Sequence, residues 1–360
     1  MDVKPRKIAI ICNYELLPTR VGGMDYFFWL FDKKCKENNI EVDWFFPNKA
    51  THGGYLRLNI IESKYNNVEH FFTQFITKKR CHYTHIITHF VEVCSPIFKK
   101  MKAISNSKII VVDHNPRPIN GYSLKKRIEK RVKGILYSRY INIFVGVSNY
   151  SKNQLIKEFG FQISKKTSVI FNGLDIKKFK QKTNFNSNAN FVIACHLRKD
   201  KGVQDVLEVV KQIKLEISIP FTITIFGEGY YEAELKRKIN EASLQEYFVF
   251  KGSVSNLHEL YCNYDYLIHP SHGETFCYTV AESLLSNLPV ITNNQGNILG
   301  LISNNSNGFL YKDHQINDLK DIIKRVLKEE IKIENGLLKD SKVTNLSLDK
   351  MVASYFQIIN

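Results

Sequence analysis

The sequence lacks several patterns that would assign it to a specialised class of protein. Its seven cysteines, among 360 residues, are odd in number and show no Cys-x-x-Cys spacing, which argues against a disulfide framework and a zinc knuckle. No run of 18 apolar residues occurs, and Met1 to Arg6 do not read as the start of a signal peptide. No Asp-x-Asp triplet offers carboxylate ligands to a divalent ion. We therefore expect a protein of the reducing cytoplasm with no spanning helix, resident metal or cofactor.

The composition is that of an ordinary globular chain. Apolar residues make up 44% and charged residues 24%, which argues against disorder and low complexity. A chain of 360 residues is long for one core and sufficient for two domains. Short apolar runs alternate with amphipathic segments almost from end to end, a pattern typical of βα units built on a parallel sheet. The sequence therefore predicts two doubly wound α/β domains.

The first series of predicted elements occupies the first half of the chain. Helices are predicted at Met24 to Asn38 and Leu124 to Arg139. The predicted strands are Lys7 to Asn13, Glu41 to Phe46, His85 to His89, Lys108 to Val112, Asn142 to Val147 and Thr167 to Phe171. The polar segment Lys180 to Asn190 has no periodicity and is predicted to be a linker.

A second series follows that segment. The predicted strands are Phe191 to Cys195, Phe221 to Phe226, Tyr247 to Lys251, Tyr266 to His269 and Pro289 to Thr292. The predicted helices are Val203 to Lys214, Tyr231 to Ala242, Cys277 to Ser286, Asn317 to Lys332 and a tail helix within Leu346 to Ile359. Ligands of such sheets bind beyond the carboxyl ends of the strands, so a cleft between two facing sheets is the expected site.

The positive charge lies in one half of the chain. Residues 1–180 carry 32 basic and 14 acidic side chains, a net +18, whereas residues 181–360 have a net −2. This asymmetry favours an anionic partner for the first half: nucleic acid, an acidic substrate or a membrane surface. No nucleic-acid recognition motif is present and the basic residues are diffuse, so nucleic acid is not the expected partner.

The segment 124–139 is a basic amphipathic helix by its spacing. It carries an apolar stripe of Leu124, Ile128, Val132, Ile135 and Leu136, which is narrow enough to pack inward on the sheet. Its charged face would then contact anionic lipid or a phosphorylated acceptor. The cations predicted for that contact are Lys125, Lys126, Arg127, Lys130, Arg131 and Lys133.

The most informative stretch is 269–282, HPSHGETFCYTVAE. A buried strand ends at Pro270, a polar turn carries Glu274, and a helix begins near Cys277. Amide groups at a helix start attract phosphate oxygens. Glu282, further along this helix, could accept hydrogen bonds from a sugar diol. The fragment alone is equally compatible with one exposed carboxylate and one that satisfies a helix terminus.

This stretch and several others resemble one family. Glu274-x7-Glu282 followed by Pro289-Val-Ile is similar to the E-x7-E region of the retaining, nucleotide-sugar-dependent glycosyltransferases of family 4, which have the GT-B fold. Further matches follow in the same order: Gly22-Gly23, Val147-Ser148, Val169 to Asp175, His196 to Gly202, Phe226 to Gly229, Phe250 to Gly252 and Asn307 to Leu310. Together they cover nearly the whole chain, which makes the resemblance far more specific than any single motif.

The resemblance implies an α/β GT-B architecture of two Rossmann-like doubly wound domains that face each other across a cleft. The first, at 1–180, would bind the acceptor, with the helix at about 346–360 packing back on it. The second, at 190–342, would bind the nucleotide sugar.

The resemblance also implies site roles. Lys201 would contact the diphosphate, Glu274 the donor-sugar hydroxyls and Glu282 the ribose, while His114 would lie near the donor sugar. Glu274, His114 and Lys201 are thus the predicted catalytic residues. Further donor contacts are expected from the Gly22-Gly23 loop and from Phe276, Cys277, Tyr278 and Thr279 at the helix start. Since His196 stands where the family often has an arginine, either His196 or Arg198 could provide the second cation.

Three departures from the family pattern bear on specificity. Cys277 and Asn287 stand where glycines are usual, and the Gly-Gly pair expected near Gln295 to Gly300 is incomplete. These changes affect the sugar-specific contacts more than the diphosphate site. Without an Asp-x-Asp triplet, lysine and helix termini would balance the phosphate charge, in keeping with the metal independence of the GT-B fold.

The predicted function is that of a retaining, hexosyltransferase-type enzyme. It would move a sugar from a UDP- or GDP-linked donor to a saccharide or lipid-linked acceptor, in cell-surface polysaccharide or glycolipid synthesis. It would work in the cytoplasm, peripheral to the inner face of the membrane. The alternative is a basic nucleic-acid- or membrane-binding module on the same scaffold without transfer activity.

Overall fold

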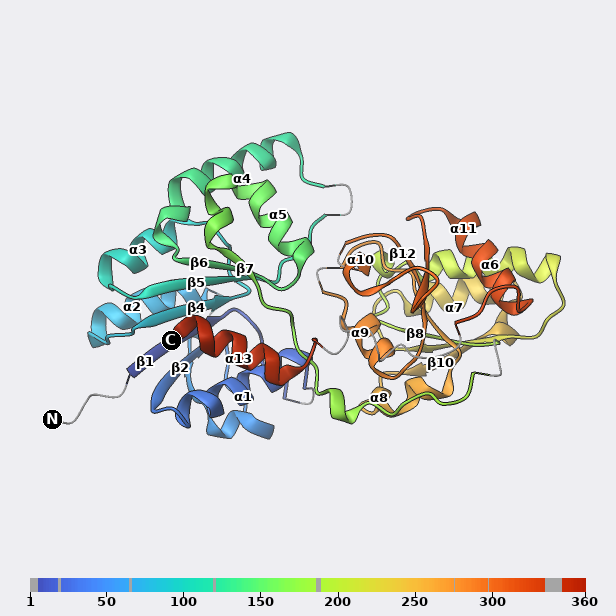
Figure 1. The fold of residues 1–360 in the computed structure, drawn as a ribbon, viewed down its shortest axis with the longest axis horizontal. Helices are drawn as coiled ribbons and strands as arrows, with labels where there is room; N and C mark the ends of the chain where they lie inside the picture. The colour runs from blue at the N-terminus through green and yellow to red at the C-terminus, as the bar shows by residue number, and fades with distance from the viewer. Residues whose placement is uncertain are drawn as a thin grey trace. The chain divides into compact units, whose positions relative to one another are not determined.

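The chain divides into two compact units. The computed structural model describes residues 6–18, 21–64, 67–118, 121–185, 189–274, 276–296, 298–333 and 345–360. The first unit comprises Met1–Gly173 and Ser347–Asn360, and the second comprises Leu174–Leu346 (Figure 1). The predicted linker at 180–190 is wrong, because this segment lies within the second unit. The Lys182 ammonium is buried there and donates to the carbonyl oxygen of Tyr264 at 2.6 Å and to Asp265 at 3.1 Å.

The first unit is built on one sheet. Within the described residues, seven parallel strands follow the order β3-β2-β1-β4-β5-β6-β7. The strands are β1 Arg6–Cys12, β2 Ile40–Phe46, β3 Asn59–Glu62, β4 His85–His89, β5 Lys108–Asp113, β6 Ile143–Gly146 and β7 Thr167–Val169. Runs such as 8–12 and 109–113 are buried throughout, as expected for a parallel sheet that is covered on both faces.

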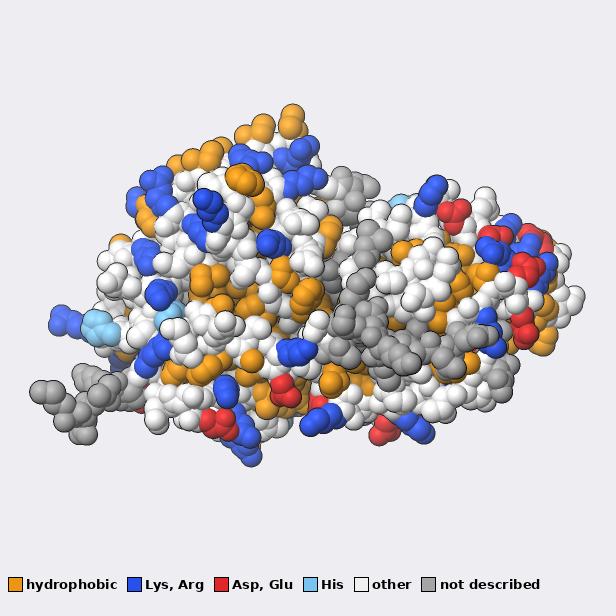
Figure 2. Space-filling model, viewed as in Figure 1, with side chains coloured by type: hydrophobic (Ala, Val, Ile, Leu, Met, Phe, Trp, Pro, Cys, Tyr) orange, Lys and Arg blue, Asp and Glu red, His pale blue; other side chains and the backbone are white. Residues whose placement is uncertain are grey.

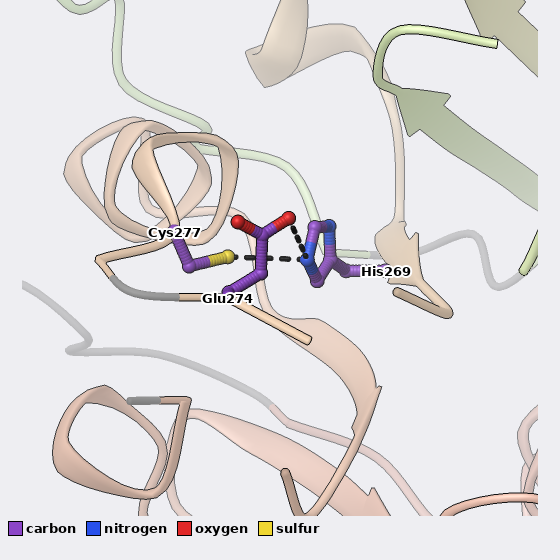
Figure 3. Close-up of side chains that lie close together, drawn as sticks. All are labelled: His269, Glu274 and Cys277. Atoms are coloured by element: carbon purple, nitrogen blue, oxygen red, sulfur yellow. Dashed lines mark hydrogen bonds and ion pairs between the residues drawn. The ribbon is translucent and has the colours of Figure 1, made fainter. Parts of the chain in front are cut away.

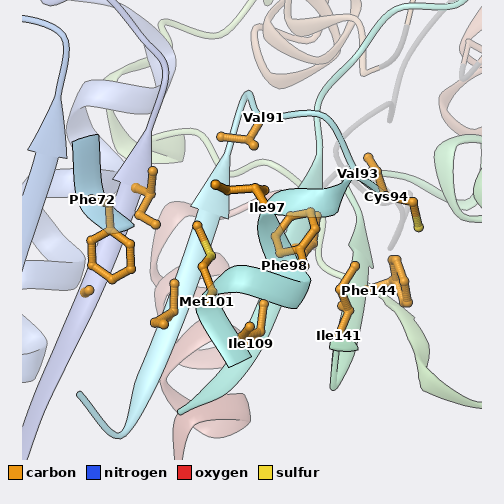
Figure 4. Close-up of a cluster of buried hydrophobic side chains, with 14 of the residues drawn as sticks. Phe72, Val91, Val93, Cys94, Ile97, Phe98, Met101, Ile109, Ile141 and Phe144 are labelled. Atoms are coloured by element: carbon orange, nitrogen blue, oxygen red, sulfur yellow. The ribbon is translucent and has the colours of Figure 1, made fainter. Parts of the chain in front are cut away.

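Helices cover both faces of this sheet (Figure 1). The α-helices are α1 Gly23–Lys36, α2 Val68–Lys79, α3 Pro96–Ile104, α4 Leu124–Tyr137, α5 Asn149–Phe159 and α13 Leu348–Ile359, and the 3₁₀ turns are η1 Gly53–Arg57, η2 Ser138–Tyr140 and η3 Phe161–Lys166. On one face, buried side chains of α2, α3 and α5 pack with strand residues in a single cluster that includes Phe72, Phe98 and Phe144 (Figure 4). On the other face, α13 packs on α1, where the Phe27 and Tyr355 ring centroids are 4.7 Å apart.

The second unit repeats the plan. Six parallel strands among its described residues follow the order β10-β9-β8-β11-β12-β13. They are β8 Asn190–Ala194, β9 Thr222–Phe226, β10 Phe248–Gly252, β11 Tyr266–His269, β12 Val290–Asn293 and β13 Gly308–Tyr311. The helices are α6 Val203–Glu216, α7 Glu232–Glu241, α8 Leu257–Leu260, α9 Tyr278–Leu285, α10 Ile298–Leu301 and α11 Ile316–Leu327, and the 3₁₀ turns are η4 Ile176–Lys178, η5 Lys199–Lys201, η6 Gln245–Tyr247 and η7 Tyr261–Asn263.

Both sheets have the strand order of a Rossmann fold, so the predicted α/β class is confirmed. In each sheet, successive strands are added first on one side of the starting strand and then on the other. The change of side falls between β1 and β4 in the first unit and between β8 and β11 in the second. Ligands of open α/β sheets bind beyond the carboxyl ends of the two strands that flank this switch point. The strand order therefore directs attention to the loops that follow β1, β4, β8 and β11.

The helix α4 differs from its prediction in one respect. Its apolar stripe was expected to pack inward, yet Leu124, Ile128 and Ile135 are 70%, 56% and 59% exposed. The helix rests on the unit through the opposite face, where Gly134 is its one buried residue and Lys130 reaches the Glu158 carboxylate at 3.0 Å. A methyl group on Gly134 would lie 1.9 Å from the carbonyl oxygen of Phe159, so the lack of a side chain there sets this packing.

Substituting Gly134 tests this packing. Because an alanine Cβ would overlap the Phe159 carbonyl oxygen, we expect Gly134→Ala to lower the free energy of unfolding by about 2–3 kcal/mol. Alanine in an exposed helix would instead stabilise by about 1 kcal/mol, so the sign of the change is diagnostic. Urea denaturation measures it. The exposed neighbour Ile135→Ala is the control and should shift stability by less than about 0.5 kcal/mol. A Gly134→Ala protein as stable as wild type would contradict the packing described.

Candidate active site

The switch point of the second sheet brings Lys201 and Glu274 together. Lys201 ends the turn η5 after β8, and Glu274 lies in the loop after β11. The Lys201 ammonium donates to Glu274 Oε1 at 2.6 Å, and the two side chains are only 12% and 19% exposed. The sequence predicted both residues for the site, and the structure pairs them directly.

A glycine allows the two loops to meet. Gly202 has φ +72°, in the left-handed region, and a Cβ there would lie 2.1 Å from the carbonyl oxygen of Pro270. Only glycine accepts both that conformation and that contact without displacement of the backbone. The Lys-Gly junction of the sequence therefore brings the backbone after Lys201 against the residue that follows β11, and the helix α6 begins immediately afterwards.

Two further polar side chains, one at each end of the loop after β11, lie beside Glu274 (Figure 3). His269, at the end of β11, has its Nε2 atom 3.7 Å from Glu274 Oε1. Cys277 Sγ lies 3.2 Å from the same nitrogen atom. Cys277 is buried and forms the N-cap of α9 with φ +64°, a conformation that glycine adopts more readily than any other residue. The unusual cysteine of the motif thus stands at a backbone position suited to glycine.

Burial determines the protonation of this group. Removal from water lowers the pKa of His269 to about 4, although Glu274 partly opposes the shift. It also raises the pKa of the Cys277 thiol. At neutral pH the histidine is therefore uncharged and the thiol protonated, and the tautomer of the imidazole decides which of the two donates the hydrogen bond.

Glu282 is held by a residue that the sequence did not indicate. The Tyr261 hydroxyl, in η7, donates to Glu282 Oε2 at 3.1 Å. Burial raises the pKa of the Glu282 carboxyl, while the tyrosine hydrogen bond opposes that shift. No local pattern links these positions, because they belong to different segments of the chain.

Sequence analysis also gave no role to His272, a histidine of this region whose pKa is raised. Its Nε2 atom lies 3.2 Å from Asp205 Oδ2 and its Nδ1 atom 3.0 Å from Asp313 Oδ1. The hydrogen bond to Asp205, supported by Asp313, raises the pKa of His272 to about 9 despite its burial. A buried imidazolium therefore joins the loop after β11 to the start of α6 and to the end of β13.

The remaining predicted donor residues of the second unit differ in exposure. Arg198 is exposed and pairs with Asp200, Nη2 to Oδ2 at 3.0 Å, and His196 is also exposed. Phe276 is buried, whereas Tyr278 and Thr279 are half-buried in the first turn of α9. The structure therefore leaves the identity of the second cation open between His196 and Arg198.

The predicted residues of the first unit lie at the corresponding edge of their own sheet. Gly22 is the N-cap of α1, its N–H group donates to Asp25 Oδ2 at 2.5 Å, and Gly23 begins the helix. His114 follows β5, and its Nε2 atom lies 2.9 Å from His89 Nδ1, at the end of β4. Burial lowers the pKa of His114 to about 3, so its imidazole is neutral.

A buried ionic network supports the loop that carries His114. The Arg117 guanidinium contacts Asp113 at 2.6 Å and Glu158 at 2.9 Å, and Lys130 contacts Glu158 at 3.0 Å. Arg117 and Asp113 are almost fully buried. Sequence reasoning did not identify this network, although the Asp-x3-Arg spacing of 113 and 117 is visible in the sequence.

The fold is shared with known glycosyltransferases. The lipopolysaccharide outer core galactosyltransferase WaaB, in its apo form, is similar with a TM-score of 0.72 and 17% identity over 98% of this chain and 99% of that one. The Anabaena protein Alr3699/HepE in complex with UDP gives a TM-score of 0.73 at 16% identity, with the same coverage. The chain therefore has the GT-B fold.

Sequence comparison relates the second unit to one family. Residues 175–339, nearly all of the second unit, match the model of the glycosyl transferases group 1 family. N-acetyl-alpha-D-glucosaminyl L-malate synthase of Bacillus anthracis is 22% identical over 67% of this chain and 71% of its own length. The GtfA subunit of a UDP-N-acetylglucosamine–peptide N-acetylglucosaminyltransferase of Streptococcus gordonii is 29% identical over 28% of this chain, and that match spans only 20% of the relative. An uncharacterized glycosyltransferase of Methanocaldococcus jannaschii is matched over 56% of its length.

The raised pKa of His272 predicts a pH-dependent contribution to stability. Its pKa of about 9 in the folded state exceeds the unfolded value of about 6.5. The contribution is therefore complete below about pH 6.5 and is lost as the pH rises through 9. We expect His272→Gln to destabilise by roughly 2 kcal/mol at pH 6 and by progressively less up to pH 9.5. Urea denaturation of both proteins across this range measures the difference. A difference that does not change with pH would show that His272 is not a buried cation.

Proposed function

We propose that the protein is a retaining glycosyltransferase that uses a nucleotide-sugar donor. The observation that carries the proposal is the partly buried Lys201–Glu274 pair at the switch point of the second sheet. It combines a cation suited to a diphosphate with a carboxylate suited to sugar hydroxyls, at the edge where ligands of such sheets bind. The similarity to group 1 glycosyltransferases, and to a structural neighbour that binds UDP, supports this assignment.

In this mechanism Lys201 stabilises the negative charge of the leaving diphosphate. Negative charge develops on the leaving diphosphate as the glycosidic bond breaks, and a preorganised cation stabilises that charge. Glu274 keeps the Lys201 ammonium at this edge of the sheet before the donor arrives, and the ammonium turns from Glu274 to the phosphate when the donor binds. Amide groups at the start of α6 and α9 add positive potential at the same edge of the sheet.

Glu274 and Glu282 bind the rest of the donor in this proposal. Glu274 accepts hydrogen bonds from the donor-sugar hydroxyls once the Lys201 ammonium turns toward phosphate. Glu282 accepts from the ribose diol, and the Tyr261 hydroxyl orients the carboxylate for that role. Both acids lie on the loop and helix that follow β11, so their spacing is fixed by one segment of the chain.

The proposed stereochemical course is retention. The donor's own phosphate accepts the proton of the attacking acceptor hydroxyl on the front face, so no separate protein base is required. His114, near the donor sugar in this proposal, is neutral and provides a hydrogen bond. A UDP- or GDP-linked hexose as donor, and a saccharide or lipid-linked acceptor of cell-surface polysaccharide or glycolipid synthesis, complete the proposed reaction.

Substitutions at the ion pair test the catalytic assignment. We expect Lys201→Ala and Glu274→Gln each to lower kcat/KM for sugar transfer by about 100-fold or more. The first variant loses the proposed contact to the diphosphate charge and the second the proposed carboxylate contact to the sugar hydroxyls, and both contacts stabilise the transition state. A screen of nucleotide-sugar donors by nucleotide release identifies the substrate, and NMR of the product gives its anomeric configuration.

Lys199→Ala is the matched control. This lysine lies on the same 3₁₀ turn as Lys201 but is exposed, so kcat/KM should fall by less than about threefold. Rates near wild type for both Lys201→Ala and Glu274→Gln would overturn the assignment. An inverted product would leave the donor site intact but reject front-face attack.

We also propose that α4 binds the surface of an anionic membrane. Among the described residues, no helix is long and apolar enough to cross a bilayer. The apolar stripe of α4 is exposed to solvent, with Leu124, Ile128 and Ile135 more than half exposed. Hydrophobic and basic side chains lie side by side over this helix (Figure 2). A helix that exposes apolar side chains among cations has the pattern of an interfacial element.

The cations of α4 differ in their availability to lipid. Lys130 is bound to Glu158, and Lys133 contacts both Glu92 at 2.5 Å and Glu129 at 2.8 Å, so these two serve the unit itself. Lys125, Lys126, Arg127 and Arg131 are exposed and are the cations proposed to meet lipid phosphates. Two of them also have partners on the surface, because Lys126 pairs with Glu129 at 3.0 Å and Arg131 donates to the carbonyl oxygen of Lys157 at 3.0 Å.

The stripe can be tested directly. We expect the double variant Ile128→Glu, Ile135→Glu to lower binding to phosphatidylglycerol-containing vesicles by about tenfold or more, because it adds like charge and removes apolar contact. Co-sedimentation at low salt measures the binding. Leu215→Glu, at an 83% exposed leucine of the second unit, is the control and should bind as wild type does. No binding of the wild type at low salt would rule out the membrane surface.

A further inference from the structure

Three different ligand atoms converge beside the proposed donor site. Nε2 of His269, a carboxylate oxygen of Glu274 and Sγ of Cys277 all lie within 4.8 Å of one another (Figure 3). We propose that these residues form a binding site for a thiophilic divalent cation, Zn²⁺ in the first instance. The ligand set is one imidazole, one carboxylate and one thiolate, a combination that zinc accepts in four-coordinate sites with water in the fourth position.

The distances between the ligand atoms fit such an ion. Zinc–sulfur and zinc–nitrogen bonds of about 2.3 and 2.0 Å in a tetrahedral arrangement separate the two ligand atoms by about 3.5 Å. Sγ of Cys277 lies 3.2 Å from Nε2 of His269, and that nitrogen lies 3.7 Å from Glu274 Oε1. Small side-chain adjustments would therefore place an ion among them.

The backbone holds this arrangement firmly. His269 ends a central strand and is 4% exposed, and its carbonyl oxygen accepts a hydrogen bond from the Thr292 hydroxyl at 2.7 Å. The backbone of Gly296, with φ +62°, packs so closely that a Cβ would lie 2.6 Å from the Glu274 carbonyl oxygen. A non-glycine residue in the left-handed region, as at Cys277, costs about 1 kcal/mol or more, and such strain is found preferentially at functional positions.

A second group of possible ligands does not have these properties. Among the described residues, His272, Asp313 and His314 also lie close together. Both ring nitrogens of His272 are already bound to carboxylates, those of Asp205 and Asp313, and His314 is 60% exposed. This group contains no thiol, so the two sites can be told apart spectroscopically.

Binding at the proposed site involves proton transfer and no redox change. The S–H bond of Cys277 breaks, the proton passes to solvent, and the sulfur electron pair forms the metal–sulfur bond. His269, as the tautomer with its proton on Nδ1, then donates the Nε2 lone pair to the ion. The Lys201 ammonium, 2.6 Å from Glu274 Oε1, is repelled by the ion and must move away.

Occupation has a consequence for the neighbouring chemistry. An ion bound to Glu274 withdraws this carboxylate from donor-sugar hydroxyls, so Zn²⁺ should inhibit sugar transfer reversibly. This consequence rests on the proposed function, whereas binding of the ion does not. The sequence spacing gave no sign of the site, because His-x4-Glu-x2-Cys is not a common zinc pattern and two of its members had other predicted roles.

Titration with Co²⁺ tests the site without reference to activity. In the presence of a non-chelating phosphine reductant, we expect one Co²⁺ per chain and a thiolate-to-cobalt charge-transfer band that Zn²⁺ abolishes by competition. Cys277→Gly should lose the band and bind Co²⁺ about tenfold more weakly or worse. Glycine suits the backbone at φ +64°, so this variant should remain folded, which circular dichroism and Tm verify.

Two further variants make the test specific. Cys262→Ser, in the same unit but outside the group, should keep the band unchanged. Lys201→Ala should tighten Co²⁺ binding by about threefold or more, because it removes a competing cation, an effect that a purely structural role of Glu274 would not produce.

The proposal is overturned if wild type gives no thiolate band at excess Co²⁺, if Cys277→Gly retains it, or if Cys262→Ser abolishes it. UDP binding, measured by calorimetry on the same preparations without metal, reports on the donor site separately. Failure to bind Co²⁺ therefore does not imply failure to bind UDP, nor the reverse.

Discussion

The close contact between the loop after β8 and the loop after β11 is the constraint on which the second unit's chemistry depends. Gly202 lies against the carbonyl oxygen of Pro270 with no room for a side chain. This contact exists because β8 and β11 are neighbours at the point where the strand order reverses. Lys201 and Glu274 lie on these two separate loops and meet at this point, and neither loop crosses the sheet. The remaining site residues are arranged around that meeting point.

Charges within this region are compensated at short range. Lys201 is paired with Glu274, and the imidazolium of His272 lies between Asp205 and Asp313, whereas the more deeply buried His269 and Cys277 are neutral. Unpaired buried charges would be expensive, and paired ones retain a fixed orientation. The site thus maintains polar groups in a definite geometry before any ligand is bound.

Much of this arrangement could be predicted from the sequence. Buried strands such as 8–12 and 109–113 are apolar runs with clear ends, and Lys201, Glu274 and Glu282 stand in motifs with recognisable spacing. Strands β3 and β13 were not predicted; each is the terminal strand of its sheet, with a neighbour on one side only. The partners of His272 and Glu282 come from distant segments, so only the tertiary fold reveals them. The orientation of α4 was predicted wrongly because periodicity identifies an apolar stripe but not the surface that it faces, which Gly134 decides here.

The path of the chain between the two units has a consequence for how the molecule is made. Leu174 N–H donates to the carbonyl oxygen of Leu346 at 2.8 Å, so the outgoing and returning segments run together where the second unit begins and ends. The helix α13 then covers α1, and Tyr355 is fully buried against Phe27. During synthesis on the ribosome, the face of the first sheet that α13 covers stays uncovered until the whole second unit has been made. The first unit to emerge is therefore the last to complete its core, which leaves an apolar surface for a chaperone to protect during translation.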